Sequence, residues 1–137
     1  ITHVDFSVDG RFLQSNCGAY ELLFWDAGSG KQITSASAVR DVEWASWTCT
    51  LGWPVQGIWP KRADGTDVNA TCRSSSGGVV ATADDFGKVN LFQYPCVSAG
   101  ASSFTARGHS SHVTNARFTA SDRYLVTAGG NDRCVFQ

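Results

Sequence analysis

The stretch 108–137 constrains the fold more than any other part of this chain. It opens with a Gly-His pair, and three short apolar runs follow it at 113–118, 124–127 and 134–136. Polar residues or paired glycines separate the runs. Short strands divided by turn signals at roughly 8–12 residue spacing are typical of an antiparallel meander. The stretch therefore predicts a small sheet of consecutive antiparallel strands.

The same pattern occurs twice more. In the N-terminal copy Phe6 falls on Phe118 and Ser15 falls on Thr127, and a third copy lies at 68–94. With Ile1, Val68 and Val113 as equivalent positions, the copies are spaced by 67 and 45 residues. The second spacing fits a repeat of about 40–45 residues, and the first is longer by roughly one hairpin. The chain is therefore expected to contain about three equivalent sheets.

Each copy carries parts of a WD40 repeat. The Gly108-His109 pair, the later Asp132 and the intact Trp25-Asp26 dipeptide are the parts that define this repeat. The sequence therefore predicts an all-β fold of WD40 β-propeller blades. Repeat 1 is expected at about 1–37, an insertion at about 40–67, repeat 2 at about 68–107 and a truncated repeat 3 at about 108–137.

A propeller blade buries its faces only against neighbouring blades, and at least about three units are needed for stability. We therefore expect residues 1–137 to be an open fragment of a larger, possibly tandem, propeller. The chain contains no Met, which favours an excerpt of a longer protein.

The insertion at about 40–67 is rich in tryptophan. It holds Trp44, Trp47, Trp53 and Trp59 and begins with alternating apolar positions. We expect an extra strand pair here, with its indole rings packed against a blade. These rings are either core residues or an aromatic patch for a partner.

Composition excludes several classes of function. A net charge of −1 argues against general binding to nucleic acid or anionic membranes, and no run approaches the roughly 18 apolar residues of a membrane span. The five cysteines form no CxxC pair, which argues against a zinc site and favours reduced thiols in the cytoplasm. We read neither His3 nor His112 as a metal ligand, and no cofactor is expected.

His109, Thr127 and Asp132 match a hydrogen-bonded chain of WD40 blades, since imidazole can link a carboxylate to a hydroxyl. A catalytic His-Asp pair is the alternative, but no nucleophile accompanies it. A hydrolase that uses Cys72 or His109 would need a reactive thiolate or such a nucleophile. The chain is therefore predicted not to be an enzyme.

Lys61, Arg62, Asp84 and Asp85 are the candidate partner contacts. The first two lie in a mixed-charge segment that continues into a predicted turn at 63–66. A merely solvated loop is the alternative there. The adjacent pair Asp84-Asp85 is either a cation site or, more simply, a turn in which Asp side chains accept backbone N–H groups.

Several longer strings resemble the echinoderm microtubule-associated protein-like family. They are TCTLGWPVQGIWPKRADGTDVNA, ADDFGKVNLFQYPC, GHSSHVTNARFT and TAGGND, and together they extend over much of the chain. The resemblance implies a tandem pair of propellers and association with microtubules and tubulin in the cytoplasmic cytoskeleton. The family's coiled coil and basic N-terminal segment have no counterpart in these residues.

This resemblance favours a non-catalytic scaffold module that binds tubulin or microtubule-linked partners through loops of the propeller surface. The remaining blades of the parent chain are further expected partners. The alternative is a WD40 scaffold of another assembly, such as a ubiquitin-ligase receptor or a ciliary complex, without tubulin binding.

Overall fold

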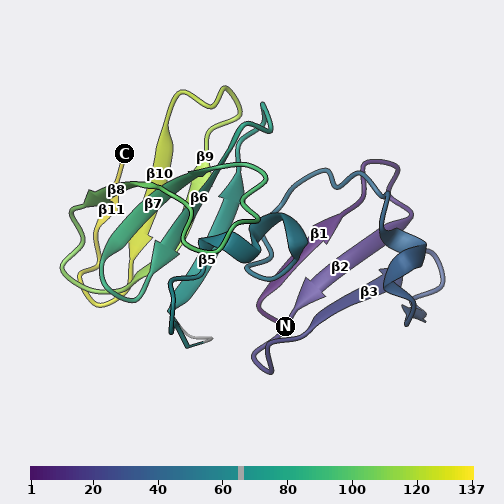
Figure 1. Ribbon diagram of the computed structural model, residues 1–137. Coiled ribbons are helices and arrows are strands. Elements are labelled where there is room, and N and C mark those ends of the chain that lie inside the picture. The colour runs from purple at the N-terminus through teal and green to yellow at the C-terminus, as the bar shows by residue number, and fades with distance from the viewer. Residues whose placement is uncertain (65–66) are drawn as a thin grey trace. The chain divides into compact units, whose positions relative to one another are not determined.

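The computed structural model describes residues 1–64 and 67–137, and in this part every strand pairing is antiparallel. The predicted all-β fold of antiparallel sheets is confirmed. The chain divides into two units, Ile1–Leu51 and Gly52–Gln137, and each is described by itself (Figure 1).

The first unit is built on a four-stranded sheet whose strands follow chain order (Figure 1). The strands are β1 (His3–Phe6), β2 (Phe12–Asn16), β3 (Leu22–Asp26) and β4 (Gln32–Ile33), and a short 3₁₀ helix, η1 (Ala36–Val39), follows. Consecutive antiparallel strands need only short turns, as the sequence pattern predicts.

The second unit begins with the 3₁₀ helix η2 (Trp53–Ile58) and continues into a four-stranded sheet in chain order. Its strands are β5 (Val68–Arg73), β6 (Val79–Asp84), β7 (Lys88–Gln93) and β8 (Phe104–Arg107).

A three-stranded sheet completes the second unit. It consists of β9 (Val113–Phe118), β10 (Leu125–Gly129) and β11 (Val135–Phe136), again in chain order. The core between these two sheets consists of small and branched side chains, which let the sheets approach closely. These residues are Ala70, Ala83, Val89, Val113, Ala116 and, partly buried, Leu125.

The first turn of each sheet has one geometry in all three copies. A hydroxyl accepts the backbone N–H of the residue five positions later; the hydroxyl residues are Ser7, Ser74 and Thr119. Three positions after the hydroxyl, the backbone has a positive φ; these residues are Gly10 (φ 70), Gly77 (φ 72) and Asp122 (φ 56). The internal repeat is therefore visible down to individual turn atoms.

The expected strand pair in 40–67 is wrong for the described part of that range. Only one isolated bridge forms there, between Ser7 and Trp44. Pro54 lies in the first turn of η2 instead, where proline suits a helix and a missing N–H costs nothing. The N–H groups of Thr48 and Cys49 are donated to the Asp5 carboxylate rather than to a neighbouring strand.

The tryptophans of this segment separate into two groups. Trp44 and Trp47 are buried in the first unit, with their rings edge to face at 6.5 Å between centroids. The Trp47 indole N–H donates to the carbonyl oxygen of Cys49 at 2.9 Å. In the second unit Trp53 is 64% exposed, and Trp59 is half-buried. The core interpretation therefore holds for Trp44 and Trp47 and does not extend to Trp53.

Candidate functional site

His109, Thr127 and Asp132 lie in contact with one another. His109 Nδ1 is 2.8 Å from Asp132 Oδ2, and Nε2 of the same ring is 2.9 Å from Thr127 Oγ1. The side chains of His109 and Asp132 are only 2% and 4% exposed. The ring therefore joins strand β10 to the turn between β10 and β11.

The protonation of this chain follows from its partners. The pKa of Asp132 is held below its ordinary value by the backbone N–H of Cys134, and His109 lowers it further. An ionised carboxylate only accepts, so Nδ1 of His109 carries a proton and donates it to Asp132. In the neutral ring, Nε2 then accepts the hydroxyl proton of Thr127.

Glycine is required beside this chain. A Cβ atom on Gly129 would lie 1.8 Å from Asp132 Oδ1 and 2.6 Å from His109 Nδ1. A Cβ atom on Gly130 would lie 1.9 Å from Nε2 of His112. The two glycines make room for two imidazole rings. A cavity of about 430 Å³, lined mainly by apolar groups, adjoins His109 and Thr127.

The other two sheets carry related but different connections. In the first unit the Trp25 indole N–H donates to Ser15 Oγ at 2.9 Å. In the sheet β5–β8, Asn90 Nδ2 lies 3.4 Å from both Thr82 Oγ1 and Asp84 Oδ2. A polar group on the second strand is thus tied to the third strand in both sheets.

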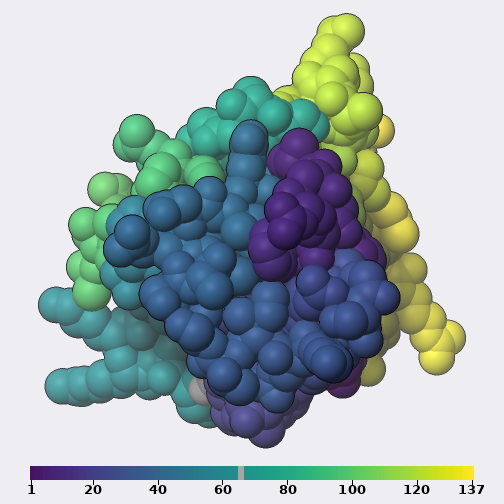
Figure 2. Space-filling view, turned by 90° about the vertical axis from the view of Figure 1, so that its right-hand side faces the viewer, coloured from purple at the N-terminus to yellow at the C-terminus, as the bar shows by residue number. Residues whose placement is uncertain are grey.

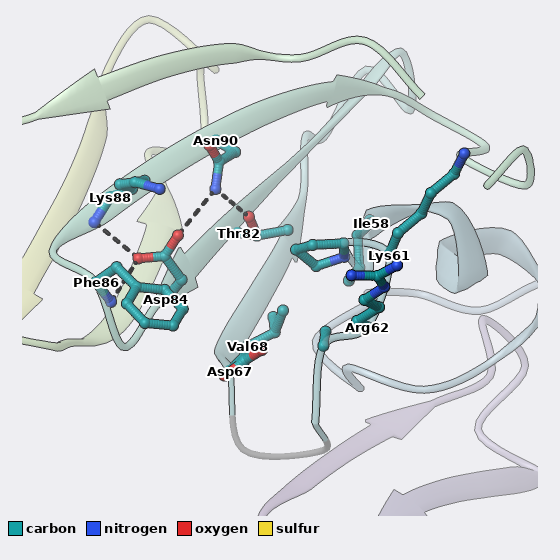
Figure 3. A pocket seen from close by; sticks show the side chains of 12 residues that line it. Ile58, Lys61, Arg62, Asp67, Val68, Thr82, Asp84, Phe86, Lys88 and Asn90 are labelled. Carbon is teal, nitrogen blue, oxygen red and sulfur yellow. Dashed lines mark hydrogen bonds between the residues drawn. The ribbon is translucent and has the colours of Figure 1, made fainter. Parts of the chain in front are cut away.

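Lys61, Arg62 and Asp84 line one cavity of about 210 Å³ in the second unit. Lys61 and Arg62 lie on one side, and Asp84 lies on the other, with Thr82 between them (Figure 3). Lys61 and Arg62 are both exposed. In Figure 2, teal atoms from this region of the chain project outward at the lower left. The expected turn at 63–66 lies partly outside the described residues.

Asp84 is engaged by its own turn. Its Oδ1 accepts the backbone N–H of Phe86 at 2.9 Å and that of Lys88 at 2.8 Å (Figure 3). Its side chain is largely buried, and the residue is only 8% exposed. This is the turn-forming role that was weighed against a cation site.

Asp85 does not line the cavity. Its Oδ1 accepts Asn69 Nδ2 at 2.8 Å, and the same amide nitrogen also donates to the carbonyl oxygen of Val113 at 3.0 Å. Asp85 therefore braces the start of β5 against the start of β9, while its exposed side chain remains open to solvent on one side.

The sequence analysis missed further residues around the cavity. A second cavity of about 360 Å³ is lined by Lys88 and Asn90 together with Arg107. Lys88 and Asn90 lie two positions apart on β7, so they share one face of the sheet. The sequence shows that Lys88 and Asn90 share a face. Arg107 on β8 lies beside them only because its strand pairs with β7, where Lys88 is its partner.

Asp5 is the other residue that the sequence analysis missed. It is 1% exposed, and its carboxylate accepts hydrogen bonds from Ser46 Oγ at 2.5 Å and from the N–H groups of Thr48 and Cys49. Burial raises the pKa of Asp5, but these hydrogen bonds outweigh that effect and hold the pKa below its ordinary value.

Across residues 1–64 and 67–137, no cluster of three or more His, Cys, Asp or Glu side chains is arranged to hold a metal ion. No helix in the same residues has the length and apolar character to cross a membrane.

Comparison with known proteins gives a match along the whole chain. Residues 1–137 match the family described as the echinoderm microtubule-associated protein second beta-propeller. The chain is 55% identical to echinoderm microtubule-associated protein-like 3 of Homo sapiens and 52% identical to the 77 kDa echinoderm microtubule-associated protein of Strongylocentrotus purpuratus. All of the chain aligns in both cases, and it spans 15% and 20% of the two relatives.

A solved structure has the same fold. The beta-propeller domain of Cps50 (Swd1) from Myceliophteria thermophila matches with a TM-score of 0.60 and 19% identity, over 94% of this chain and 49% of that one. At this identity the likeness concerns the fold alone, and it confirms the predicted propeller architecture.

Proposed function

Because the chain belongs to the echinoderm microtubule-associated protein family, we propose that it serves as a non-catalytic interaction module of a microtubule-associated protein. The observation that carries the proposal is the match of residues 1–137 to the second propeller of that family. The module acts in the cytoplasm on the microtubule cytoskeleton, and its partners are tubulin or proteins linked to microtubules.

Rigid sheets present their connecting loops as a fixed surface, and loops on such scaffolds commonly carry binding residues. The proposed contacts are Lys61, Arg62, Asp84 and Asp85. Lys61 and Arg62 are exposed and lie at one cavity with Asp84, which supports a contact of mixed charge. Asp85 contributes from the neighbouring turn.

His109, Thr127 and Asp132 have a structural role in this proposal. Their polar atoms are directed at one another, and His109 and Asp132 are almost completely buried. They fix the turn between β10 and β11, and they take no part in chemistry on a substrate. The proposal therefore needs no cofactor.

Direct binding to purified tubulin tests the proposal. The full-length protein is immobilised and incubated with αβ-tubulin, alone and in competition with a cell lysate. We expect tubulin to be retained and enriched over other lysate proteins, and Arg62→Glu to weaken retention while Lys31→Glu, an exposed cation in the first unit, does not.

Failure of the wild-type protein to retain tubulin would contradict the tubulin-binding part of the proposal. Selective enrichment of a ubiquitin-ligase or ciliary assembly in its place would favour the alternative scaffold function.

A further inference from the structure

A carboxylate joins the first turns of the sheets β5–β8 and β9–β11. Asp122, in the turn between β9 and β10, accepts the backbone N–H groups of Ser75 and Ser76 at 2.8 and 2.7 Å, one on each oxygen. The backbone N–H of Ser75, that of Ser76 and the hydroxyls of both serines hold the pKa of Asp122 below its ordinary value. The turn 74–77 is therefore a binding site for a carboxylate that the neighbouring sheet supplies.

The turn 119–122 has the same backbone geometry as the turn 74–77. Each is closed by an N–H that donates to the carbonyl oxygen three positions earlier, at 2.9 Å in the later turn and 3.0 Å in the earlier one. In each, a hydroxyl also accepts the N–H five positions later. Ala120 and Ser121 therefore occupy the places that the two serines have in the earlier turn, and their N–H groups form a second pair of donors.

This second pair of donors has no acceptor in the part of the chain that the structure describes. Ala120 and Ser121 are both exposed, and no described atom accepts either backbone N–H. In the first unit the N–H equivalent to that of Ala120 belongs to Val8, and it donates to the carbonyl oxygen of Glu43 at 2.8 Å. Two of the three turns thus receive an acceptor from outside the turn, and in both cases it comes from the element that follows the sheet in the chain.

The side chains of each turn decide which acceptor fits. In the first turn Asp9 lies two positions after the hydroxyl, and its negative charge favours a neutral carbonyl oxygen there. The equivalent residues in the other turns are Ser76 and Ser121, which carry no charge. Arg123 is exposed beside the last turn, and its positive charge offsets the one that Asp122 brings. The pair at 120–121 therefore suits the same acceptor as the pair at 75–76, a group with one oxygen for each N–H.

We propose that the N–H groups of Ala120 and Ser121 bind the carboxylate of an Asp or Glu side chain from the neighbouring blade of the full-length propeller, on the side of β9–β11 turned away from β5–β8. A blade buries its faces only against its neighbours, so a blade packs on that side as β9–β11 packs on β5–β8. Hydrogen bonds from two N–H groups to an ionised carboxylate are stronger than neutral ones. The contact fastens the next pair of blades in the way that Asp122 fastens this one.

Amide hydrogen exchange of the full-length protein tests the site directly. We expect Ala120 and Ser121 to exchange at least about tenfold more slowly than Ala99, because a bound N–H exchanges only when its contact opens. Ala99 is an exposed residue of the loop before β8, and no described atom accepts its N–H. Exchange of Ala120 and Ser121 as fast as that of Ala99 would overturn the inference.

Ala120→Pro removes one of the two donors. Ala120 holds the second position of its turn, where proline is favoured. Ala99→Pro is the matched control, because Ala99 holds the second position of the turn that the Ala101 N–H closes on the carbonyl oxygen of Ser98. Proline at such a position raises stability slightly when no contact is lost. We expect Ala120→Pro to lower the thermal midpoint of the full-length protein by a few degrees and Ala99→Pro not to lower it, and equal effects would overturn the inference.

Ser121→Asp tests the chemistry of the acceptor, since it places a negative charge where the first turn has one. We expect exchange of the Ala120 amide to become several-fold faster in Ser121→Asp and to stay within about twofold of wild type in Ser121→Asn, which is neutral and of similar size. Equal acceleration in both variants, or none in Ser121→Asp, would show that the acceptor is not anionic and would overturn the inference. Each readout concerns the folded propeller itself, so it is separate from the retention of tubulin.

Discussion

At the scale of single residues, two buried carboxylates organise polar contacts that the hydrophobic pattern does not show. Asp5 holds the segment 46–49 against β1, and Asp132 holds His109 against the turn after β10. Buried charged groups are stable only when their hydrogen bonds are satisfied. Each of these residues is therefore a point where one substitution alters the fold locally.

Asp5→Asn should lower the free energy of unfolding by about 2 kcal/mol at neutral pH, as expected for hydrogen bonds to a buried charge. The amide places an NH₂ group where two N–H donors now meet an oxygen. Because the pKa of Asp5 lies below its ordinary value of 3.8, its stabilisation is complete above pH 3.8 and is lost as the pH falls below that value.

Urea unfolding between about pH 6 and about pH 3 measures this effect, and the difference between wild type and Asp5→Asn should shrink at the acid end. Asp41→Asn is the control, since its exposed carboxylate pairs with the equally exposed Arg40. It should change the stability by less than about 0.5 kcal/mol. A constant deficit of Asp5→Asn at every pH would contradict the linkage.

The sequence predicted the contacts of Asp132 but not those of Asp5. His109, Thr127 and Asp132 could be grouped because each occupies a position of a known repeat pattern. Asp5 could not be grouped, because its partners are backbone N–H groups more than forty positions away in the chain. Because every residue except proline has a backbone N–H group, the residue types at these positions do not reveal the contact.

At the scale of elements, the turn that opens each sheet is both shared and specialised. The residue three positions after the hydroxyl has positive φ in all three copies, and it is glycine in two of them. In the last copy it is Asp122, whose two carboxylate oxygens accept the N–H groups of Ser75 and Ser76 at 2.8 and 2.7 Å. These bonds hold the pKa of Asp122 below its ordinary value.

Asp122→Asn should loosen the turn between β5 and β6. Asparagine tolerates the left-handed conformation, so the turn that contains residue 122 keeps its shape. Its amide offers one acceptor oxygen where the carboxylate offers two. We expect amide hydrogen exchange at Ser75 and Ser76 to become several-fold faster.

Hydrogen exchange followed by mass spectrometry provides the measurement. Asp9→Asn is the control, because Asp9 accepts hydrogen bonds from Ser7 and Arg11 within its own turn. Unchanged protection of Ser75 and Ser76 in Asp122→Asn would show that the contact contributes nothing to the turn.

The strands were predictable because alternation and turn residues recur three times. The segment 40–67 was not, because its alternating start suggested strand while its partners decided otherwise. The N–H groups of Thr48 and Cys49 donate to a side chain, and Pro54 lies in the first turn of a 3₁₀ helix. Tertiary hydrogen bonds overrode a local preference that was itself weak.

At the scale of the whole molecule, the two units differ in how they are stabilised. The buried apolar side chains of the first unit are Val39, Trp44, Trp47 and Cys49, and its remaining buried groups are largely polar. The second unit encloses apolar side chains between two sheets. A chain of about 50 residues with so small a core is near the limit for independent folding.

Excised residues 52–137, which keep two packed sheets, should therefore retain more folded structure than excised residues 1–51, which should lack a cooperative transition. Near-ultraviolet circular dichroism reports the packing of the tryptophans in the smaller fragment, Trp25, Trp44 and Trp47, and thermal scans report cooperativity in both. A sharp transition of residues 1–51 alone would contradict this prediction.

The shared turn has a consequence for how such repeats diversify. A hydroxyl and one residue in the left-handed conformation define the bend, and that conformation restricts the residue to glycine or a short polar side chain such as Asp or Asn. The side chain at that position can make contacts outside its own turn. In the last copy the Asp122 carboxylate does so and links two adjacent sheets. New couplings between blades can thus arise by exchanging one residue, without redrawing the path of the chain.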